Sequence, residues 1–192
     1  MTSRRAHPAL AAFSLAAACA LPAHAGDVAL AADSQWSAFA VDGALEPSLS
    51  WIADSGSPLA FDFSIANGFV GTLTIVDAVF NGDTFKVTNF GSPLGSTSSV
   101  PLADYASATD HGLDFDAALA DSSFSRAVFT LGAGSYRIGG FLDQSLLLDG
   151  QRLDATAGAL RLSVAPVPEP STYAILLAGF GVVGLIARRR RG

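Results

Sequence analysis

The chain has 192 residues, with 17 acidic side chains, 11 basic ones and a single cysteine. This length fits one domain between two terminal segments. Residues 26–167 hold 16 acidic side chains against five basic ones, a net charge of −11. That charge excludes nucleic acid as a partner of this part and opposes its binding to anionic lipid headgroups.

The first 25 residues have the three parts of a secretory signal peptide. Arg4 and Arg5 precede an apolar stretch over residues 9–21, and Ala23 and Ala25 form an A-x-A cleavage site. The pattern predicts export and cleavage after Ala25. The one cysteine leaves with this signal, so we expect neither a disulfide nor a reactive thiol in the mature chain.

Residues 26–165 are expected to form the body of the protein. After a small, polar and flexible start over residues 26–33, apolar side chains recur at every second position, which is typical of strands with one buried face. Phe61, Phe63 and Ile65 show this alternation clearly. The predicted strands cover residues 36–41, 50–53, 59–65, 72–76, 84–88, 127–131, 136–138, 145–148 and 160–164.

Turn signals separate these strands. Residues 81–83 (Asn-Gly-Asp) are the strongest, because Asn-Gly accepts positive φ at little cost, and residues 132–134 (Gly-Ala-Gly) are a second. Residues 91–110 are rich in Gly, Ser, Thr and Pro and are expected to be irregular, whereas residues 113–122 hold the only helical turn. Short alternating strands without a long helix predict an all-β, antiparallel, jelly-roll-like β-sandwich, with a partly open barrel as the alternative.

His111 does not belong to a recognisable catalytic pattern. It is the single histidine after residue 25, and it lies beside Asp110. A Ser-His-Asp triad would need an exposed serine, but the chain has no Gly-x-Ser-x-Gly elbow, and zinc would need further His or Cys ligands. We therefore expect no enzymatic activity, and a secreted hydrolase ranks third among the functions considered.

Four aspartates lie within 12 positions of one another, in the irregular part of the body. Carboxylates and backbone carbonyls are the oxygen ligands that Ca²⁺ takes, so such a segment is a candidate calcium site. The chain contains no EF-hand pattern, however, and an ordinary acidic surface loop is the favoured interpretation. No cofactor is expected. The four are Asp110, Asp114, Asp116 and Asp121.

Three aromatic side chains in the body are candidates for stacking on sugar rings: Trp36, Trp51 and Tyr105. For the two tryptophans the favoured interpretation is core packing, because both stand in apolar alternation. A polysaccharide-binding module at the cell surface is therefore the second-ranked function, with exopolysaccharide as its partner.

The tail, residues 166–192, has three parts. Val167, Pro168, Glu169 and Pro170 belong to a motif over residues 167–171, and the run from residue 172 to 187 carries no charge. As a helix this run would span about 24 Å, slightly less than the roughly 30 Å hydrocarbon core of a bilayer. The basic segment 188–192 favours the cytoplasmic side, so a single helix across the inner membrane is predicted. Its charges are those of Arg188, Arg189, Arg190 and Arg191.

This order of motif, apolar run and arginines resembles a PEP-CTERM sorting signal, a tag of exported proteins of Gram-negative bacteria that is also named an ice-binding protein C-terminal domain. The resemblance implies that an exosortase, a membrane-embedded transpeptidase, recognises Pro-Glu-Pro and removes the tail. The alternative is a plain tail anchor, which has no use for Pro-Glu-Pro just outside the bilayer. Residues 179–184 fit G-x-G-x-x-G, but inside the apolar run they are interpreted as small residues that allow close helix contact.

The body resembles a β-domain that recurs in PEP-CTERM proteins and in some extracellular fungal proteins. The resemblance assigns no catalytic activity. Three segments carry it: residues 71–78 (Gly-Thr-Leu-Thr-Ile-Val-Asp-Ala), residues 82–87 (Gly-Asp-Thr-Phe-Lys-Val) and residues 129–136 (Phe-Thr-Leu-Gly-Ala-Gly-Ser-Tyr).

The sequence thus predicts an exported, non-enzymatic protein of the cell surface or extracellular matrix. A signal peptide delivers it, and the tail holds the precursor in the inner membrane until an exosortase processes it. Exopolysaccharide is the alternative partner of the body, and nucleic acid is not expected as one.

Overall fold

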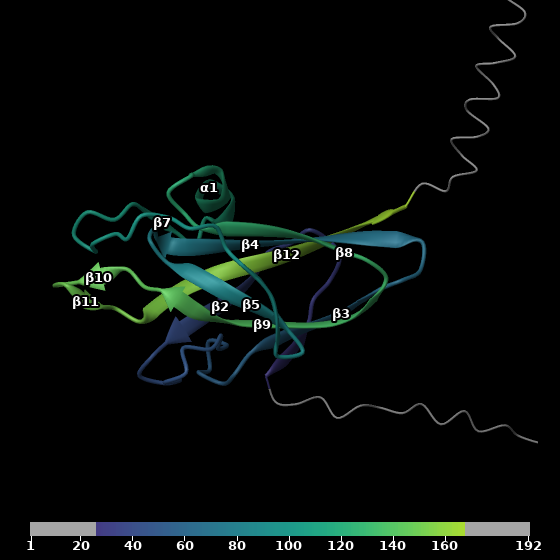
Figure 1. The fold of residues 1–192 in the computed structure, drawn as a ribbon, viewed down its shortest axis with the longest axis horizontal. Coiled ribbons are helices and arrows are strands. Elements are labelled where there is room, and N and C mark those ends of the chain that lie inside the picture. Colours follow the sequence, from purple (N-terminus) through teal and green to yellow (C-terminus); the bar gives the residue numbers. More distant parts are fainter. Residues whose placement is uncertain (1–25, 168–192) are drawn as a thin grey trace, which may run out of the picture.

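The computed structural model describes residues 26–167, whose regular elements are strands apart from one short helix (Figure 1). The all-β prediction is confirmed. The elements are β1 (Asp27–Ala29), β2 (Ser37–Asp42), β3 (Ala60–Ile65), β4 (Phe69–Phe80), β5 (Thr84–Asn89), β6 (Ser92–Ser96), β7 (Asp110–Gly112), α1 (Phe115–Ala120), β8 (Arg126–Leu131), β9 (Gly134–Gln144), β10 (Leu147–Leu148), β11 (Gln151–Arg152) and β12 (Ala155–Pro166).

The strands form two main sheets. The first has the order β1-β3-β9-β5-β6, and the second has the order β2-β12-β4, with β8 and β7 also paired to β4. The long strands β4 and β12 run antiparallel, with register pairs from Phe69↔Pro166 to Ala78↔Ala157. A separate small hairpin joins β10 to β11.

The core lies between the two sheets, which form two layers in Figure 1. Leu73 and Ile75 of β4 face it from the second sheet, and Phe85 and Val87 of β5 face it from the first; each is at most 1% exposed. The period-two pattern of the sequence places these side chains inward. Burying such a side chain stabilises the fold by about 1.5–3 kcal/mol relative to leaving it in water.

Trp51 fills the centre of this core. Its ring stacks on Phe39 at 3.9 Å between centroids, and it is 1% exposed. The neighbouring strand approaches so closely that a Cβ on Gly140 would come within 2.6 Å of the indole. Glycine is therefore required at position 140, because any side chain would clash with the tryptophan.

The structure corrects the expectations for two segments of the body. Residues 26–33, expected to be a flexible start, contain β1, which pairs in parallel with β3 within a fold predicted to be antiparallel. The expected irregular stretch 91–110 contains β6, which pairs with β5. Both short strands are edges of the first sheet, where pairing with a distant strand rather than local alternation decides the conformation.

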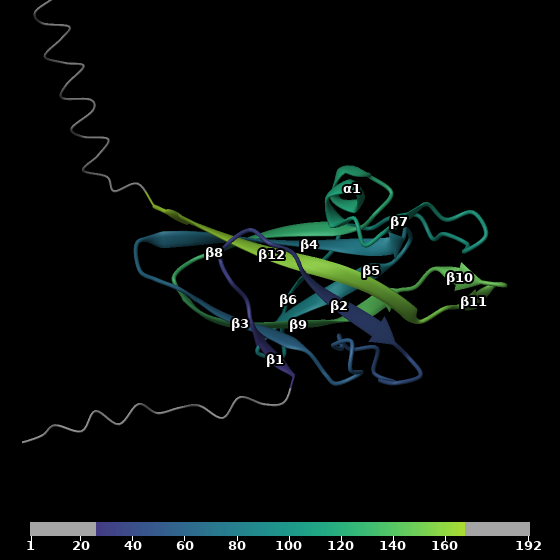
Figure 2. The same cartoon turned by 180° about the vertical axis from the view of Figure 1, so that it is seen from behind.

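The last described residue is tied to the β3–β4 turn. The backbone N–H of Val167 donates to the carbonyl of Gly68 at 2.8 Å, directly after the final β12–β4 pair. Figures 1 and 2 both show the end of β12 beside this turn. We call this end of the molecule the exit end; it consists of residues 65–70, 131–135 and 163–167.

The predicted terminal segments lie outside the described residues. These are the signal peptide with Ala23 and Ala25, and the tail with Pro168, Glu169, Pro170, the apolar run and Arg188–Arg191.

Candidate functional site

The four aspartates predicted as a low-ranked calcium site surround α1. Asp114 is the N-cap of this helix and accepts the backbone N–H of Ala117 at 2.9 Å, while Asp110 accepts the N–H of Gly112 at 2.7 Å. Within residues 26–167, no group of three or more His, Cys, Asp or Glu side chains is arranged to hold a metal ion. Local hydrogen bonds explain the first two aspartates.

Asp121 and His111 form a pair at the other end of α1. The imidazole Nε2 lies 3.1 Å from Oδ2 of Asp121, whose Oδ1 accepts both the backbone N–H and the hydroxyl of Ser123. These bonds from Ser123, followed by the one from His111, lower the pKa of Asp121. In the described residues no hydroxyl is hydrogen-bonded to His111, so the geometry does not assemble a nucleophile, base and acid.

The three aromatic candidates are not brought together. Trp51 lies in the core, so the structure excludes it as a sugar-stacking residue. Trp36 is half-buried: its Nε1 donates to Asp116 at 3.1 Å, and the Arg161 guanidinium lies 4.3 Å from its ring centroid. Tyr105 is exposed and packs on Phe80. Of the three, only Tyr105 is among the exposed residues, at 44% exposure.

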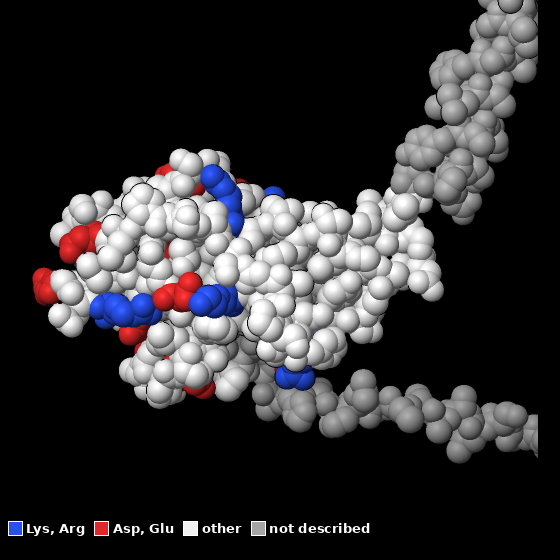
Figure 3. Space-filling view, in the orientation of Figure 1, with Lys and Arg blue, Asp and Glu red and all other residues white. Residues whose placement is uncertain are grey.

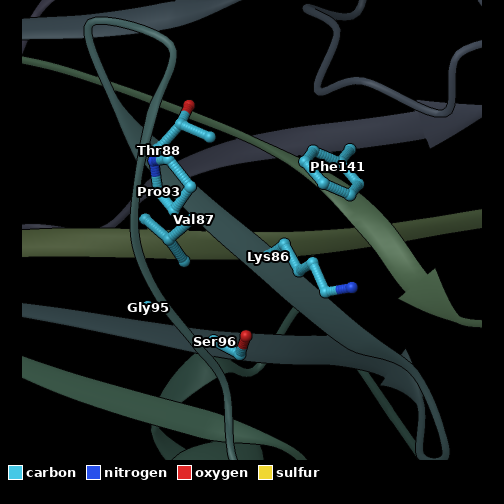
Figure 4. A pocket seen from close by; sticks show the side chains of 7 residues that line it. All are labelled: Lys86, Val87, Thr88, Pro93, Gly95, Ser96 and Phe141. Atoms are coloured by element: carbon cyan, nitrogen blue, oxygen red, sulfur yellow. The ribbon is translucent and has the colours of Figure 1, made fainter.

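A hollow of about 300 Å³ lies where β5, β6 and β9 run side by side (Figure 4). Phe141, 36% exposed, stands opposite Lys86 in the register of β9 and β5. The Lys86 ammonium pairs with Asp143 at 2.9 Å, so an apolar ring and two charged groups share this surface. The hollow is lined by Lys86, Val87, Thr88, Pro93, Gly95, Ser96 and Phe141. Sequence alternation did not single out Phe141, because one phenylalanine among many gives no signal of exposure.

Two aspartates that the sequence analysis did not treat as a site are completely buried. Asp77, near the end of β4, and Asp83, directly before β5, are both 0% exposed. The backbone N–H of Asp83 donates to Oδ2 of Asp77 at 3.3 Å, and the N–H of Leu146 donates to Oδ1 of Asp83 at 2.7 Å. Among the described residues, Oδ1 of Asp77 and Oδ2 of Asp83 have no hydrogen-bond partner.

Burial makes ionisation of this aspartate pair unfavourable. It raises the pKa of Asp77 well above its usual value, and repulsion from Asp83 raises it further. Burial also raises the pKa of Asp83 to about 6, although the nearby Thr156 hydroxyl and the bond from the Leu146 N–H act in the opposite direction. Since no substrate reaches side chains without exposed surface, the pair is structural.

The tail, which carries the strongest sequence signal, follows directly after the fold. Val167 is the one residue of the predicted Val-Pro-Glu-Pro motif that the structure describes, and it lies at the exit end, half-exposed. In the described range, no helix has the length and apolar character needed to cross a bilayer.

Comparison with known proteins supports the assignment of the tail. Residues 166–191 match the family model described as the PEP-CTERM protein-sorting motif. A comparison with curated proteins finds no match. Among solved structures, the chain is similar to the pre-peptidase C-terminal domain of a collagenase from Bacillus anthracis. That similarity has 10% sequence identity and a TM-score of 0.38, and it covers 74% of this chain and 98% of the collagenase domain.

Proposed function

Because the chain carries a PEP-CTERM protein-sorting motif, we propose that it is an exported surface or matrix protein that an exosortase-type transpeptidase releases from the inner membrane. In this proposal the signal peptide starts export and is cut after Ala25. Residues 172–187 then hold the precursor in the bilayer, and Arg188–Arg191 stay on the cytoplasmic side. The β-body itself has a structural, non-enzymatic role.

The observation that carries this proposal is the match of the whole tail to the sorting motif, in the predicted order of its three parts. Pro168 and Pro170 each fix φ near −65° and lack an amide donor, so they favour an extended segment. Glu169 between them offers one carboxylate to a basic group of the enzyme. Such a segment is a suitable substrate for a protease that binds extended chains.

The chain contains a matched control for Glu169. It has only two glutamates, and each is followed by proline and serine: Glu46-Pro47-Ser48 in the body and Glu169-Pro170-Ser171 in the tail. Glu46 is partly exposed, and among the described residues its carboxylate accepts hydrogen bonds only from Ser48. We predict that Glu169→Ala leaves export intact and blocks tail removal, whereas Glu46→Ala is processed like the wild type.

Immunoblots of membrane and extracellular fractions measure this difference directly. The Glu169→Ala precursor should accumulate in the membrane fraction at full length. Normal release of a shortened Glu169→Ala protein would show that the exosortase does not recognise Glu169 in the motif. The tail would then be only an anchor.

A second candidate function is binding of exopolysaccharide, and the hollow beside Phe141 favours it. An exposed aromatic ring next to a charged pair provides stacking for a sugar ring and hydrogen bonds for its hydroxyls. We predict that Phe141→Ala weakens binding to the polysaccharide of the producing cell at least several-fold in co-sedimentation. Phe90→Ala is the control, since Phe90 is also exposed but is not among the residues that line the hollow. Equal binding by both variants would remove this hollow as a saccharide site.

A further inference from the structure

The exit end is free of charge over a continuous part of the molecule. Residues 63–76, 127–136 and 162–167 contain no Asp, Glu, Lys or Arg. Pairing brings these stretches together, because Gly71 lies opposite both Leu131 and Val164, and Ile65 lies opposite Gly134. On the face that Figure 3 shows, none of the coloured charged groups reaches this end.

The charged side chains begin just behind the exit end. Asp62 stands opposite Arg137 in the first sheet, and Arg161 stands opposite Thr74 in the second. Asp33 lies in the β1–β2 connection, next to Ser34, which donates to the carbonyl of Leu162. None of the 16 acidic side chains of residues 26–167 belongs to the segments that form the exit end, on which Phe69 and Val167 are exposed.

The fold holds the chain in place up to the start of the sorting motif. Val167 is bound to Gly68, so only residues 168–171 separate the exit end from the apolar run that begins at Thr172. Five residue steps span at most roughly 17 Å even when fully extended. The tether between fold and membrane segment is therefore very short.

Bilayer dimensions leave almost none of this tether in water. The apolar run, as a helix, is about 6 Å shorter than the hydrocarbon core, and each headgroup layer adds about 5–8 Å. If the arginines lie at the cytoplasmic boundary, the tether uses about 11–14 Å to reach the outer surface. Only a few ångströms of the tether then remain outside the headgroup layer. The exit end must therefore lie almost in contact with the headgroups.

We propose that the exit end is a lipid-contact surface, on which the body is seated against the outer headgroups of the inner membrane while the tail is uncut. This inference rests on the membrane anchoring in the proposed function. The uncharged exit end allows contact with anionic headgroups without electrostatic repulsion, while the acidic side chains of the body lie in other segments. Phe69, exposed beside the tether, is positioned to enter the headgroup layer.

Single-cysteine labelling tests the seating. Cys19→Ser removes the only native thiol, so the full-length chain can carry one fluorophore at Asn67→Cys, on the exit end, or at Gln151→Cys, in the β10–β11 hairpin. Both positions are exposed. Residue 67 lies in the β3–β4 turn and residue 151 in β11, and Figures 1 and 2 show these two elements at opposite ends of the body. The protein is placed in vesicles of phosphatidylethanolamine and phosphatidylglycerol that carry a quencher on the outer headgroups.

We expect several-fold stronger quenching at position 67 than at position 151. A 12-residue Gly/Ser insertion between Val167 and Pro168 adds about 19 Å of average reach and should bring the quenching at position 67 down toward that at position 151. Equal quenching at both positions of the uninserted chain would overturn the seating while leaving the anchor intact. Failure of the chain to float with the vesicles would overturn both the anchoring and the seating.

Discussion

Asp77 and Asp83 belong to the segments by which the sequence resembles an exported β-domain, and the structure gives these two residues a physical role. Each carboxylate binds a backbone N–H from another segment: Asp77 binds that of Asp83 across the β4–β5 turn, and Asp83 binds that of Leu146, before β10. They therefore join the turn to the end of β9. The cost of this arrangement is that two acidic groups are buried together, which favours a protonated form.

Stability is expected to fall as pH rises, because of this pair. A carboxyl whose pKa is raised on folding binds more protons in the native state than in the unfolded state, so its contribution is largest at low pH. For Asp83 the contribution is lost between about pH 4, near the unfolded value, and about pH 6, and for Asp77 the loss extends to higher pH. We predict that the free energy of unfolding decreases from pH 4 to pH 7, with about 3 kcal/mol of the decrease due to Asp83 alone and a further decrease due to Asp77, as measured by urea denaturation.

Asp77→Asn should remove much of this pH dependence and stabilise the protein at pH 8. The amide keeps an acceptor for the N–H of Asp83 and, like the protonated acid, carries no charge. Asp149→Asn is the control, because Asp149 is exposed in a turn and carries φ 50°, a conformation that asparagine tolerates. Loss of folding in Asp77→Asn at pH 8, with Asp149→Asn unaffected, would contradict a role in which the ionised pair is unfavourable.

At the scale of elements, α1 closes a second, smaller core on the outer face of β4. Val76, Ala118, Phe124 and Ala159 form it, and Trp36 packs on its rim. The guanidinium of Arg126 donates to the carbonyls of Leu119 and Asp121 and so satisfies the C-terminal end of the helix. A helix of this length is stable only through such caps and packing.

Loss of the N-cap of α1 should destabilise the protein measurably. Asp114→Ala removes the acceptor of the Ala117 N–H, and substitutions of this kind cost about 1 kcal/mol. Asp114→Asn keeps a side-chain oxygen that caps almost equally well, so it should stay close to the wild type. Guanidinium denaturation of the purified proteins compares the two. Equal losses in both variants would mean that the charge of Asp114, rather than its cap, is what stabilises the helix.

The sequence predicts those elements whose signal is local. Alternation at residues 59–65 corresponds to β3, the Asn-Gly pair at 81–82 to the turn between β4 and β5, and residues 113–122 contain α1. The strands β1 and β6 escape prediction because a distant partner, not their own pattern, makes them extended. Burial of Asp77 and Asp83 could not be predicted either, since two like charges close in sequence are normally solvated.

For the candidate site, the sequence identifies the tail but not the surface around its exit. Val-Pro-Glu-Pro, the apolar run and the arginines form one contiguous pattern, which the family model matches. By contrast, the contact between Val167 and Gly68 joins residues 99 positions apart, and the exposure of Phe141 depends on β5 and β9 pairing. Contacts between residues so far apart in the sequence cannot be predicted from local sequence patterns, and only the structure shows them.

The whole molecule is organised by charge. The body carries its acidic excess away from the exit end, whereas the four consecutive arginines lie at the far end of the tail. Across the proposed anchor, the negative and positive groups are thus separated by an uncharged segment made of the exit end, the motif and the apolar run. This arrangement agrees with a precursor that spans the inner membrane once and keeps its fold outside.

The intact mass of the protein released from the producing cells tests the central claim most directly, because it reports both termini at once. We predict a chain that starts at Gly26 and ends within or beside Pro168–Pro170, with the apolar run and the four arginines absent. In cells without the exosortase, the same measurement on the membrane fraction should find a chain that starts at Gly26 and ends at Gly192. A released protein that retains residues 172–192, or whose shortening does not depend on the exosortase, would contradict the account.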